Sequence, residues 1–135
     1  MSDCLFCKII QGDIPADRIY EDEQVLAFLD IHPVNAGHTL FISKQHADNL
    51  LETPDENLAH LMQIVKKIAP SILRAVQAEG FNLGVNTGSI AGQVIFHTHI
   101  HVMPRFSKDG HDMWHEKEIG DLTNIAERIR KEIQK

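Results

Sequence analysis

Three histidines at alternate positions are the residues in this chain best suited to chemistry. His97, His99 and His101 fall inside the run Phe96–Pro104. A β-strand turns successive side chains to opposite faces, so this spacing predicts three imidazoles on one face of a strand that Pro104 closes. Neighbouring imidazoles on such a face could share one small anionic ligand or divide the chemical tasks between them.

A pair of cysteines near the N-terminus offers a second kind of chemistry. Cys4 and Cys7 are the only two cysteines among the 135 residues. A structural disulfide is disfavoured in a cytosolic protein, and no strand precedes the pair as a thioredoxin-like motif would require. The spacing leaves a zinc site, a dithiol redox pair and plain buried thiols open. A zinc ion would need two further ligands, which the nine histidines could supply.

Two further features of the sequence could supply groups that bind a ligand near the histidines. The glycine-rich segment Asn86–Gln93 directly precedes the histidine run and is either an ordinary turn or a phosphate cradle. Asn86 is the side chain in it best placed to add a donor. Asp30 ends an apolar run before a Pro-containing loop, which makes it either a turn former or a ligand group.

The hydrophobic pattern predicts the elements that must position these residues. Alternating or apolar runs predict four further strands, over Arg18–Glu21, Val25–Asp30, Thr39–Ser43 and Phe81–Val85. Helical spacing predicts a short helix over Asp3–Gln11, a long helix that starts at the capping box Thr53–Glu56, is kinked at Pro70 and ends at Gly80, and an amphipathic helix from Leu122 to Ile133. The fold class is α+β: a mostly antiparallel five-stranded sheet with one long kinked helix and short terminal helices.

Composition limits the class of protein. A length of 135 residues predicts a single domain over residues 1–135. The formal net charge is −6, and Lys and Arg are not clustered, which argues against nucleic-acid binding. No apolar run is long enough for a membrane span, and no signal peptide is visible, so a cytoplasmic protein is expected. An exposed sheet edge would invite pairing with a second copy.

The run His97–Met103 resembles the histidine-triad motif of the HIT family of nucleotide-binding proteins, and is most similar to the Hint-like branch with zinc-binding cysteines. Five other stretches resemble landmarks of that family in the same order: Cys4–Ile10, Leu26–Ile31, Gly37–Leu40, Lys44–His46 and Gly92–Phe96. Two positions depart from the pattern. Thr98 stands where the family prefers an apolar residue, and Val94 stands where some Hint members carry a phosphate-binding serine.

The resemblance implies a hydrolase or phosphoramidase that cleaves at the α-phosphate of a purine nucleotide conjugate, such as an adenosine phosphoramidate or a diadenosine polyphosphate. His99 would attack phosphorus to form a covalent nucleotidyl-histidine, and water would then release the nucleoside monophosphate. His97 and His101 complete the triad. The implied nucleotide-binding residues are Asp30 for the ribose hydroxyls, Asn86, Gly92, Gln93 and Val94 for the phosphate, and Phe6, Ile9, Phe28, Leu29 and Ile31 for the base; for the apolar ones an ordinary core position is the alternative.

The same resemblance implies a structural zinc ion and a homodimer. By the pattern of the cysteine-bearing relatives, the metal ligands are Cys4, Cys7, His46 and His97. Such a closed Cys2His2 site leaves no position for a water, so the ion would brace the fold and take no part in the reaction.

Two other functions remain open at this level. The three histidines could together hold one catalytic metal ion, or the protein could be a nucleotide-sensing or protein-interaction module with little turnover. The segment Arg105–Glu118, which includes Trp114, is expected to be irregular and is either a surface loop or a cover over a partner's site.

Overall fold

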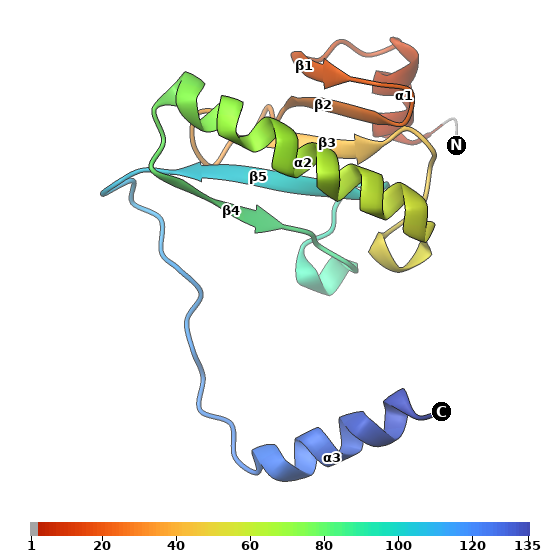
Figure 1. Ribbon diagram of the computed structural model, residues 1–135, viewed down its shortest axis with the longest axis vertical. Helices are drawn as coiled ribbons and strands as arrows, with labels where there is room; N and C mark the ends of the chain where they lie inside the picture. The colour runs from red at the N-terminus through yellow and green to blue at the C-terminus, as the bar shows by residue number, and fades with distance from the viewer. Residues whose placement is uncertain (1–2) are drawn as a thin grey trace.

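A five-stranded antiparallel sheet forms the body of the protein (Figure 1). The structure is a computed structural model, and it describes residues 3–135. Along the sheet the strands follow the order β1-β2-β3-β5-β4, which leaves β1 and β4 at the two edges. Their bounds are β1 Arg18–Glu21, β2 Val25–Leu29, β3 Thr39–Ser43, β4 Gly80–Gly84 and β5 His99–Arg105. The predicted α+β class with an antiparallel five-stranded sheet is therefore confirmed.

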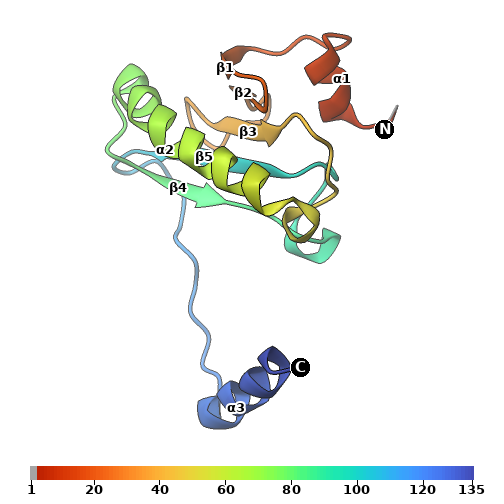
Figure 2. The same ribbon diagram turned by 45° about the vertical axis from the view of Figure 1, so that its right-hand side comes forward.

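The helices differ in how they meet this sheet. The bounds are α1 Leu5–Gln11, α2 Asp55–Val76 and α3 Leu122–Ile133, with short 3-10 turns at η1 Leu50–Glu52 and η2 Ser89–Ala91. Figures 1 and 2 show α2 lying across one face of the sheet, whereas α3 stands clear of the body at the end of an extended segment. No helix within residues 3–135 has both the length and the apolar character needed to cross a membrane.

Each face of the sheet carries its own apolar cluster. The face under α2 is filled by Val25, Ala27, Phe41, Leu61, Ile64, Val65, Ile72, Ile100 and Val102. The opposite face meets α1 through Phe6, Ile9, Leu26, Phe28, Leu40 and Ile42. Strand register sets His99 against Ile42 and His101 against Leu40, so both histidines belong to the α1 face. His99 and His101 therefore border the apolar cluster on the α1 side of the sheet, and this cluster contributes to their burial.

The strand that carries the histidines, β5, begins and ends differently from the prediction. β5 starts at His99, so His97 lies in the irregular segment just before the strand. Pro104 lies inside the strand, opposite Phe81 of β4. Its carbonyl accepts a bond from Asn35 Nδ2 at 2.9 Å, so its polar backbone side faces away from β4, beyond the point where β3 has ended. A missing N–H costs nothing in that position, which is why proline is tolerated there.

The ends of α2 also differ from the prediction. The capping box is wrong: Pro54 occupies the N-cap without a side-chain bond, and the Thr53 hydroxyl donates instead to the Asn49 carbonyl at 2.8 Å. Gly80 does not end the helix. Gln77 does so in the left-handed conformation at φ 60°, and Gly80 begins β4. The helix runs through Pro70 as one element, because the amphipathic stripe on both sides packs on the same sheet face.

Candidate functional site

Two neighbouring imidazoles on β5 form the centre of the candidate site. The ring centres of His99 and His101 lie 5.0 Å apart. His97 is fully buried, whereas His99 keeps 8% of its surface exposed and His101 is half-buried. Both rings on the strand thus remain within reach of a small ligand. His97 faces another cluster, so the predicted group of three splits into a pair and a single residue.

The backbone fixes which nitrogen of His99 carries the proton. His99 Nδ1 lies 2.6 Å from the carbonyl oxygen of His97. A carbonyl can only accept, so Nδ1 is the donor, and in the neutral ring Nε2 then carries the lone pair. A lone pair on Nε2 is what a nucleophilic imidazole requires.

A fourth histidine fixes the opposite tautomer in His101. The backbone N–H of Val34 donates to His38 Nδ1 at 2.9 Å, which leaves the proton of a neutral His38 on Nε2. That Nε2 lies 2.9 Å from His101 Nδ1 and donates to it. His101 therefore keeps its own proton on Nε2. The site places a ring with a free lone pair beside a ring that can donate a hydrogen bond.

Burial keeps these rings neutral. It lowers the pKa of His38 and of His99, and the nearby Asp30 carboxylate only partly opposes the shift. Burial, with His99 and His38 as neighbouring titratable groups, lowers the pKa of His101 to about 4. Near pH 7 the rings therefore have the neutral forms from which the tautomers above follow.

Asp30 acts both in a turn and beside the histidines. Its Oδ1 accepts from the backbone N–H of His32 at 2.8 Å, as a turn former would. Its Oδ2 lies 3.5 Å from His38 Nε2 and belongs with His38 and His101 to a group whose ligand atoms are close together. The two expectations from the sequence, turn former and ligand group, are thus compatible in one side chain.

The expected base-pocket residues divide into buried and exposed ones. Phe6 packs its ring against both His97 and His99, at 5.9 and 5.0 Å between ring centres. Phe6, Ile9 and Phe28 are buried in the α1-side cluster, while Leu29 is half-buried and Ile31 is 81% exposed. Phe6 therefore packs beside His99, and the exposed Ile31 follows Asp30 in the chain.

The glycine-rich loop is held by its own side chains. Gln93 is buried; its Oε1 accepts from Gly88 N at 2.9 Å, and its Nε2 donates to the Asp48 carbonyl at 2.7 Å. Asn86 Nδ2 lies 3.3 Å from the Gly92 carbonyl. Gly92 has φ +97°, and a Cβ there would come within 3.2 Å of that amide. The side chain of Gln93 is thus engaged inside the loop, and so is its backbone N–H, which donates to the Gly88 carbonyl at 3.1 Å; Val94 next to it is 80% exposed.

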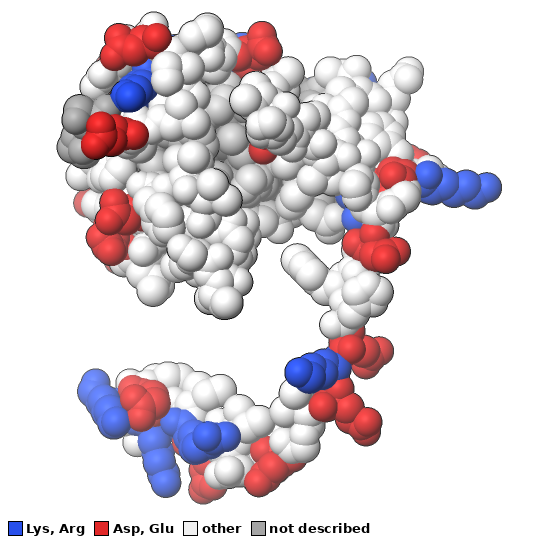
Figure 3. Space-filling model, turned by 180° about the vertical axis from the view of Figure 1, so that it is seen from behind, with Lys and Arg blue, Asp and Glu red and all other residues white. Residues whose placement is uncertain are grey.

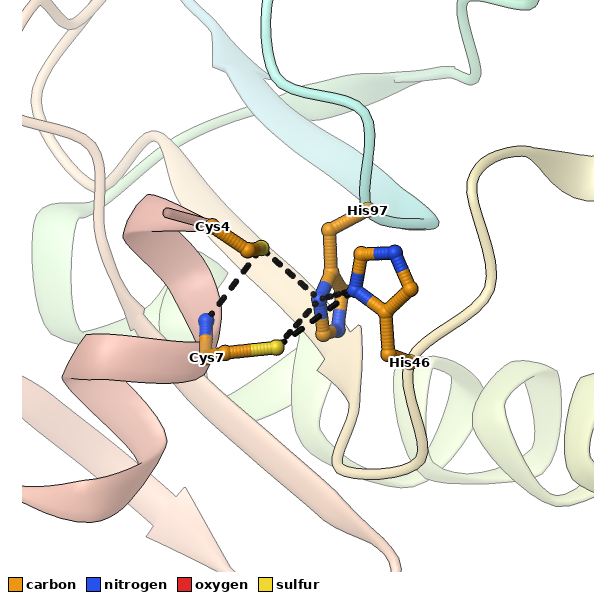
Figure 4. A group of neighbouring side chains, drawn as sticks. All are labelled: Cys4, Cys7, His46 and His97. Atoms are coloured by element: carbon orange, nitrogen blue, oxygen red, sulfur yellow. Dashed lines mark hydrogen bonds between the residues drawn. The ribbon is translucent and has the colours of Figure 1, made fainter. Parts of the chain in front are cut away.

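The second cluster joins α1, the segment after β3 and the start of the histidine run (Figure 4). Its members are Cys4, Cys7, His46 and His97, whose ligand atoms all lie within 4.8 Å of one another. His97 Nδ1 is 3.4 Å from Cys4 Sγ and 3.6 Å from Cys7 Sγ. His46 Nδ1 is 3.4 Å from Cys7 Sγ and 3.1 Å from His97 Nδ1. Ligand atoms of a tetrahedral zinc ion lie about 3.3–3.8 Å apart, close to these separations.

In both His46 and His97 the Nε2 atom carries the proton, so the two Nδ1 atoms point their lone pairs toward each other. His97 Nε2 donates to the Ser43 carbonyl at 2.6 Å, and His46 Nε2 lies 2.8 Å from Asp48 Oδ1. Two acceptors 3.1 Å apart repel each other unless a cation lies between them. Burial and Cys4 raise the pKa of the Cys7 thiol to about 11, so metal binding must displace its proton. The residues present therefore fit a zinc ion.

The orientation of His97 argues against one metal ion held by the three histidines. Its Nδ1 faces the cysteines and its Nε2 is bonded to Ser43. Neither nitrogen is free to meet a ligand shared with His99 and His101. What His97 gives His99 is its backbone carbonyl, which orients the ring.

Two features of the site were missed from the sequence. His38 is one, because its contact with His101 spans 63 positions and only the pairing of β3 with β5 creates it. The other is the place of Thr98, which departs from the apolar pattern. Its buried hydroxyl lies 2.7 Å from that of Thr53 and donates to the Ala47 carbonyl at 3.2 Å, so the polar atom is satisfied inside the protein.

Comparison with protein families matches residues 11–108 to the HIT domain. Among curated proteins, adenylylsulfatase HINT3 of Arabidopsis thaliana is 41% identical over 136 residues, which cover 94% of this chain and 69% of that protein.

Solved structures agree over most of the chain. A Streptococcus mutans protein superposes with a TM-score of 0.92 at 46% identity, covering 98% of this chain and 87% of that one. A zinc-bound histidine triad protein of Mycobacterium smegmatis gives 0.78 at 41% identity, covering 87% and 85%. A histidine triad nucleotide-binding protein of Candida albicans gives 0.85 at 33% identity, covering 98% of both chains.

Proposed function

The chain belongs to the HIT domain family, and from that premise we propose that it hydrolyses nucleotide conjugates at the α-phosphate, with His99 as the nucleophile. The observation that carries the proposal is the pair of opposite tautomers on β5. The Nε2 lone pair of His99 lies beside the Nε2–H of His101. Transfer of a nucleotidyl group needs a nucleophile for the phosphorus atom and, next to it, a hydrogen-bond donor for the phosphoryl oxygens.

The reaction proceeds in two displacements. His99 Nε2 forms a bond to the α-phosphorus, the bond from phosphorus to the leaving nitrogen or oxygen breaks, and the leaving group departs with that electron pair and takes up a proton. A nucleotidyl-histidine remains. Water then attacks the same phosphorus, loses its proton, and the nucleoside monophosphate leaves while His99 regains its lone pair. His101 Nε2–H and the backbone N–H of Val94 stabilise the negative charge that builds on the phosphoryl oxygens. The N–H groups of Gly92 and Gln93 donate to the carbonyls of Ser89 and Gly88 and hold the loop in shape.

The nucleotide would lie between the histidine pair and α1. Phe6, which touches His99, and Ile9, Phe28 and Leu29 nearby supply apolar surface for a base, and the exposed Ile31 extends it. Asp30 retains carboxylate lone pairs beyond its bond to His32 and would accept from the ribose hydroxyls. Asn86 would add a donor near the phosphate from the loop that precedes β5.

A structural zinc ion is part of the proposal. Cys4, Cys7, His46 and His97 would hold it, and by binding α1 to the start of the histidine run it would fix the carbonyl that orients His99. A cytoplasmic location belongs to the same proposal, since reduced thiols are what zinc binding requires.

The direct test is to incubate the protein with adenosine 5′-phosphoramidate and follow release of AMP. We expect turnover, and we expect His99→Ala to lower kcat/KM about a thousandfold or more. His115→Ala changes an exposed histidine of the C-terminal segment and should leave the rate unchanged. Equal rates for the two variants would contradict the assignment of His99, and binding of AMP without any turnover would favour a nucleotide-sensing role.

A further inference from the structure

Asp48 is bonded on one side to the cysteine–histidine cluster of Figure 4 and on the other side to the glycine-rich loop. Its carboxylate Oδ1 lies 2.8 Å from His46 Nε2, the nitrogen that carries the proton and therefore donates. Its backbone carbonyl accepts from Gln93 Nε2 at 2.7 Å. A single residue thus spans the two places to which the proposed function assigns zinc and phosphate.

The bond from His46 to Asp48 depends on the metal for its strength. The side chain of Asp48 is 57% exposed, and an exposed pair of this kind adds little to stability on its own. A histidine that binds a metal ion through Nδ1 is a stronger donor from Nε2, because the ion draws electrons from the ring. Zinc in the cluster would therefore strengthen this bond and fix the position of Asp48.

The side chain of Gln93 passes the position of Asp48 on to Val94. Besides its bond to Asp48, Gln93 Nε2 donates to the Ile95 carbonyl at 3.2 Å. Its Oε1 accepts from Gly88 N at 2.9 Å, and the residue is buried. Val94 lies between Gln93 and Ile95, and its backbone N–H is the donor of this loop that we assign to the phosphate. A shift of the Asp48 carbonyl would therefore move that donor.

Lysine and arginine side chains are sparse on the face of the body that carries the histidine pair. Figure 3 views the side opposite α2, and it shows them near the margins of the body and on the C-terminal arm, residues 109–135. Burial also lowers the pKa values of His99 and His101, so both rings are neutral near pH 7. Binding of a phosphate here therefore depends on hydrogen-bond donors that are held in fixed positions.

We propose that Asp48 is a positioning residue, which links zinc binding at His46 to the placement of the Val94 N–H, so that the ion tightens binding of the nucleotide's phosphate. This inference rests on the proposed function, from which it takes zinc in the cluster and phosphate at the loop. It adds an energetic coupling between the two sites and names the residue that carries it.

The first test measures zinc affinity by competition with a chromophoric chelator, starting from the zinc-loaded protein. Asp48→Ala should weaken zinc binding about 10- to 100-fold, because His46 loses the acceptor that orients its ring. Asp48→Asn keeps an acceptor oxygen and should recover most of this loss. Asp112→Ala removes a carboxylate 3.7 Å from the exposed His115, and this matched control should stay within about twofold of the wild type. Equal zinc affinities in Asp48→Ala and the wild type would overturn the proposal.

The second test measures nucleotide binding by calorimetry at saturating zinc and compares AMP with adenosine, which lacks the phosphate. Asp48→Ala should raise the dissociation constant of AMP about fivefold or more and leave that of adenosine within about twofold, because only the phosphate meets the Val94 N–H. The amide NMR signal of Val94 should move in Asp48→Ala and return toward its wild-type position in Asp48→Asn. Equal weakening of both ligands, as a loosened fold would give, or an unmoved Val94 signal would overturn the proposal.

Comparison with turnover separates the role of Asp48 from the proposed hydrolysis. Turnover by the wild type, with an AMP affinity that Asp48→Ala leaves unchanged, would overturn the role of Asp48 alone. The expected changes in zinc and AMP affinity without any turnover would overturn the hydrolysis alone.

Discussion

At the scale of single residues, the decisive property of the site is the position of two protons. His97 contributes a backbone carbonyl that sets one, and His38 contributes an Nε2–H that sets the other. The alternate spacing of the three histidines predicts a shared strand face and a nucleophile, but it does not predict tautomers, because these depend on groups supplied by other elements. The role of His97 as a metal-facing residue came only from the resemblance.

Replacing His38 tests its role as a positioning residue. His38→Leu removes the donor to His101 Nδ1, so His101 should populate both tautomers and kcat/KM should fall about 10- to 100-fold. His38→Gln keeps an N–H near the place of Nε2 and should restore most of the rate. Nitrogen-15 NMR of the His101 ring reads the tautomer directly. An unchanged His101 tautomer in His38→Leu would contradict the assignment, whatever the activity.

The pH profile tests the neutral state of the pair. The pKa of His101 is lowered to about 4, so the neutral donor persists well below pH 6.5, and burial lowers the pKa of the His99 nucleophile below its ordinary value. We expect the acid limb of kcat/KM to lie below pH 6.5, since kcat/KM reports groups of the free enzyme. A fall centred near pH 6.5 would mean that the rings titrate as exposed imidazoles.

At the scale of elements, β5 and α1 are coupled through the cysteine–histidine cluster. α1 supplies Cys7 from its first turn and Cys4 from its N-cap, and His97 closes the cluster from the segment before β5. The C-x-x-C spacing indicated half of a metal site. The other half could not come from spacing, because His46 and His97 lie 51 positions apart and meet through the pairing of β3 with β5.

Metal analysis tests this coupling. The purified protein should hold one zinc ion per chain, and Cys4→Ser should lose it and unfold at a temperature several degrees lower, because α1 is no longer fixed to His97. His115→Ala retains all four ligands and should keep the ion and the melting temperature. Zinc in the Cys4→Ser protein equal to that in the wild type would contradict the ligand set.

At the scale of the whole molecule, the chain separates into a sheet body and an arm. The strands, α2 and α3 follow from hydrophobic periodicity, which is why the α+β class could be predicted from the sequence. The wrong predictions concern the ends of elements: Thr53 and Gly80 for α2, and Pro104 for β5. At these positions tertiary contacts override the local sequence signals. Amphipathic spacing predicts that α3 has a buried side but carries no information on which surface covers it.

The central claim is that His99 forms a bond to phosphorus. The most direct measurement is mass spectrometry of protein quenched with base during turnover of adenosine 5′-phosphoramidate, since a phosphorus–imidazole bond survives base better than acid. We predict one adenylyl group on the peptide that contains His99, which appears and decays with the substrate and is absent from His99→Ala. Steady release of AMP with no adduct at any time, or an adduct on another residue, would contradict the account.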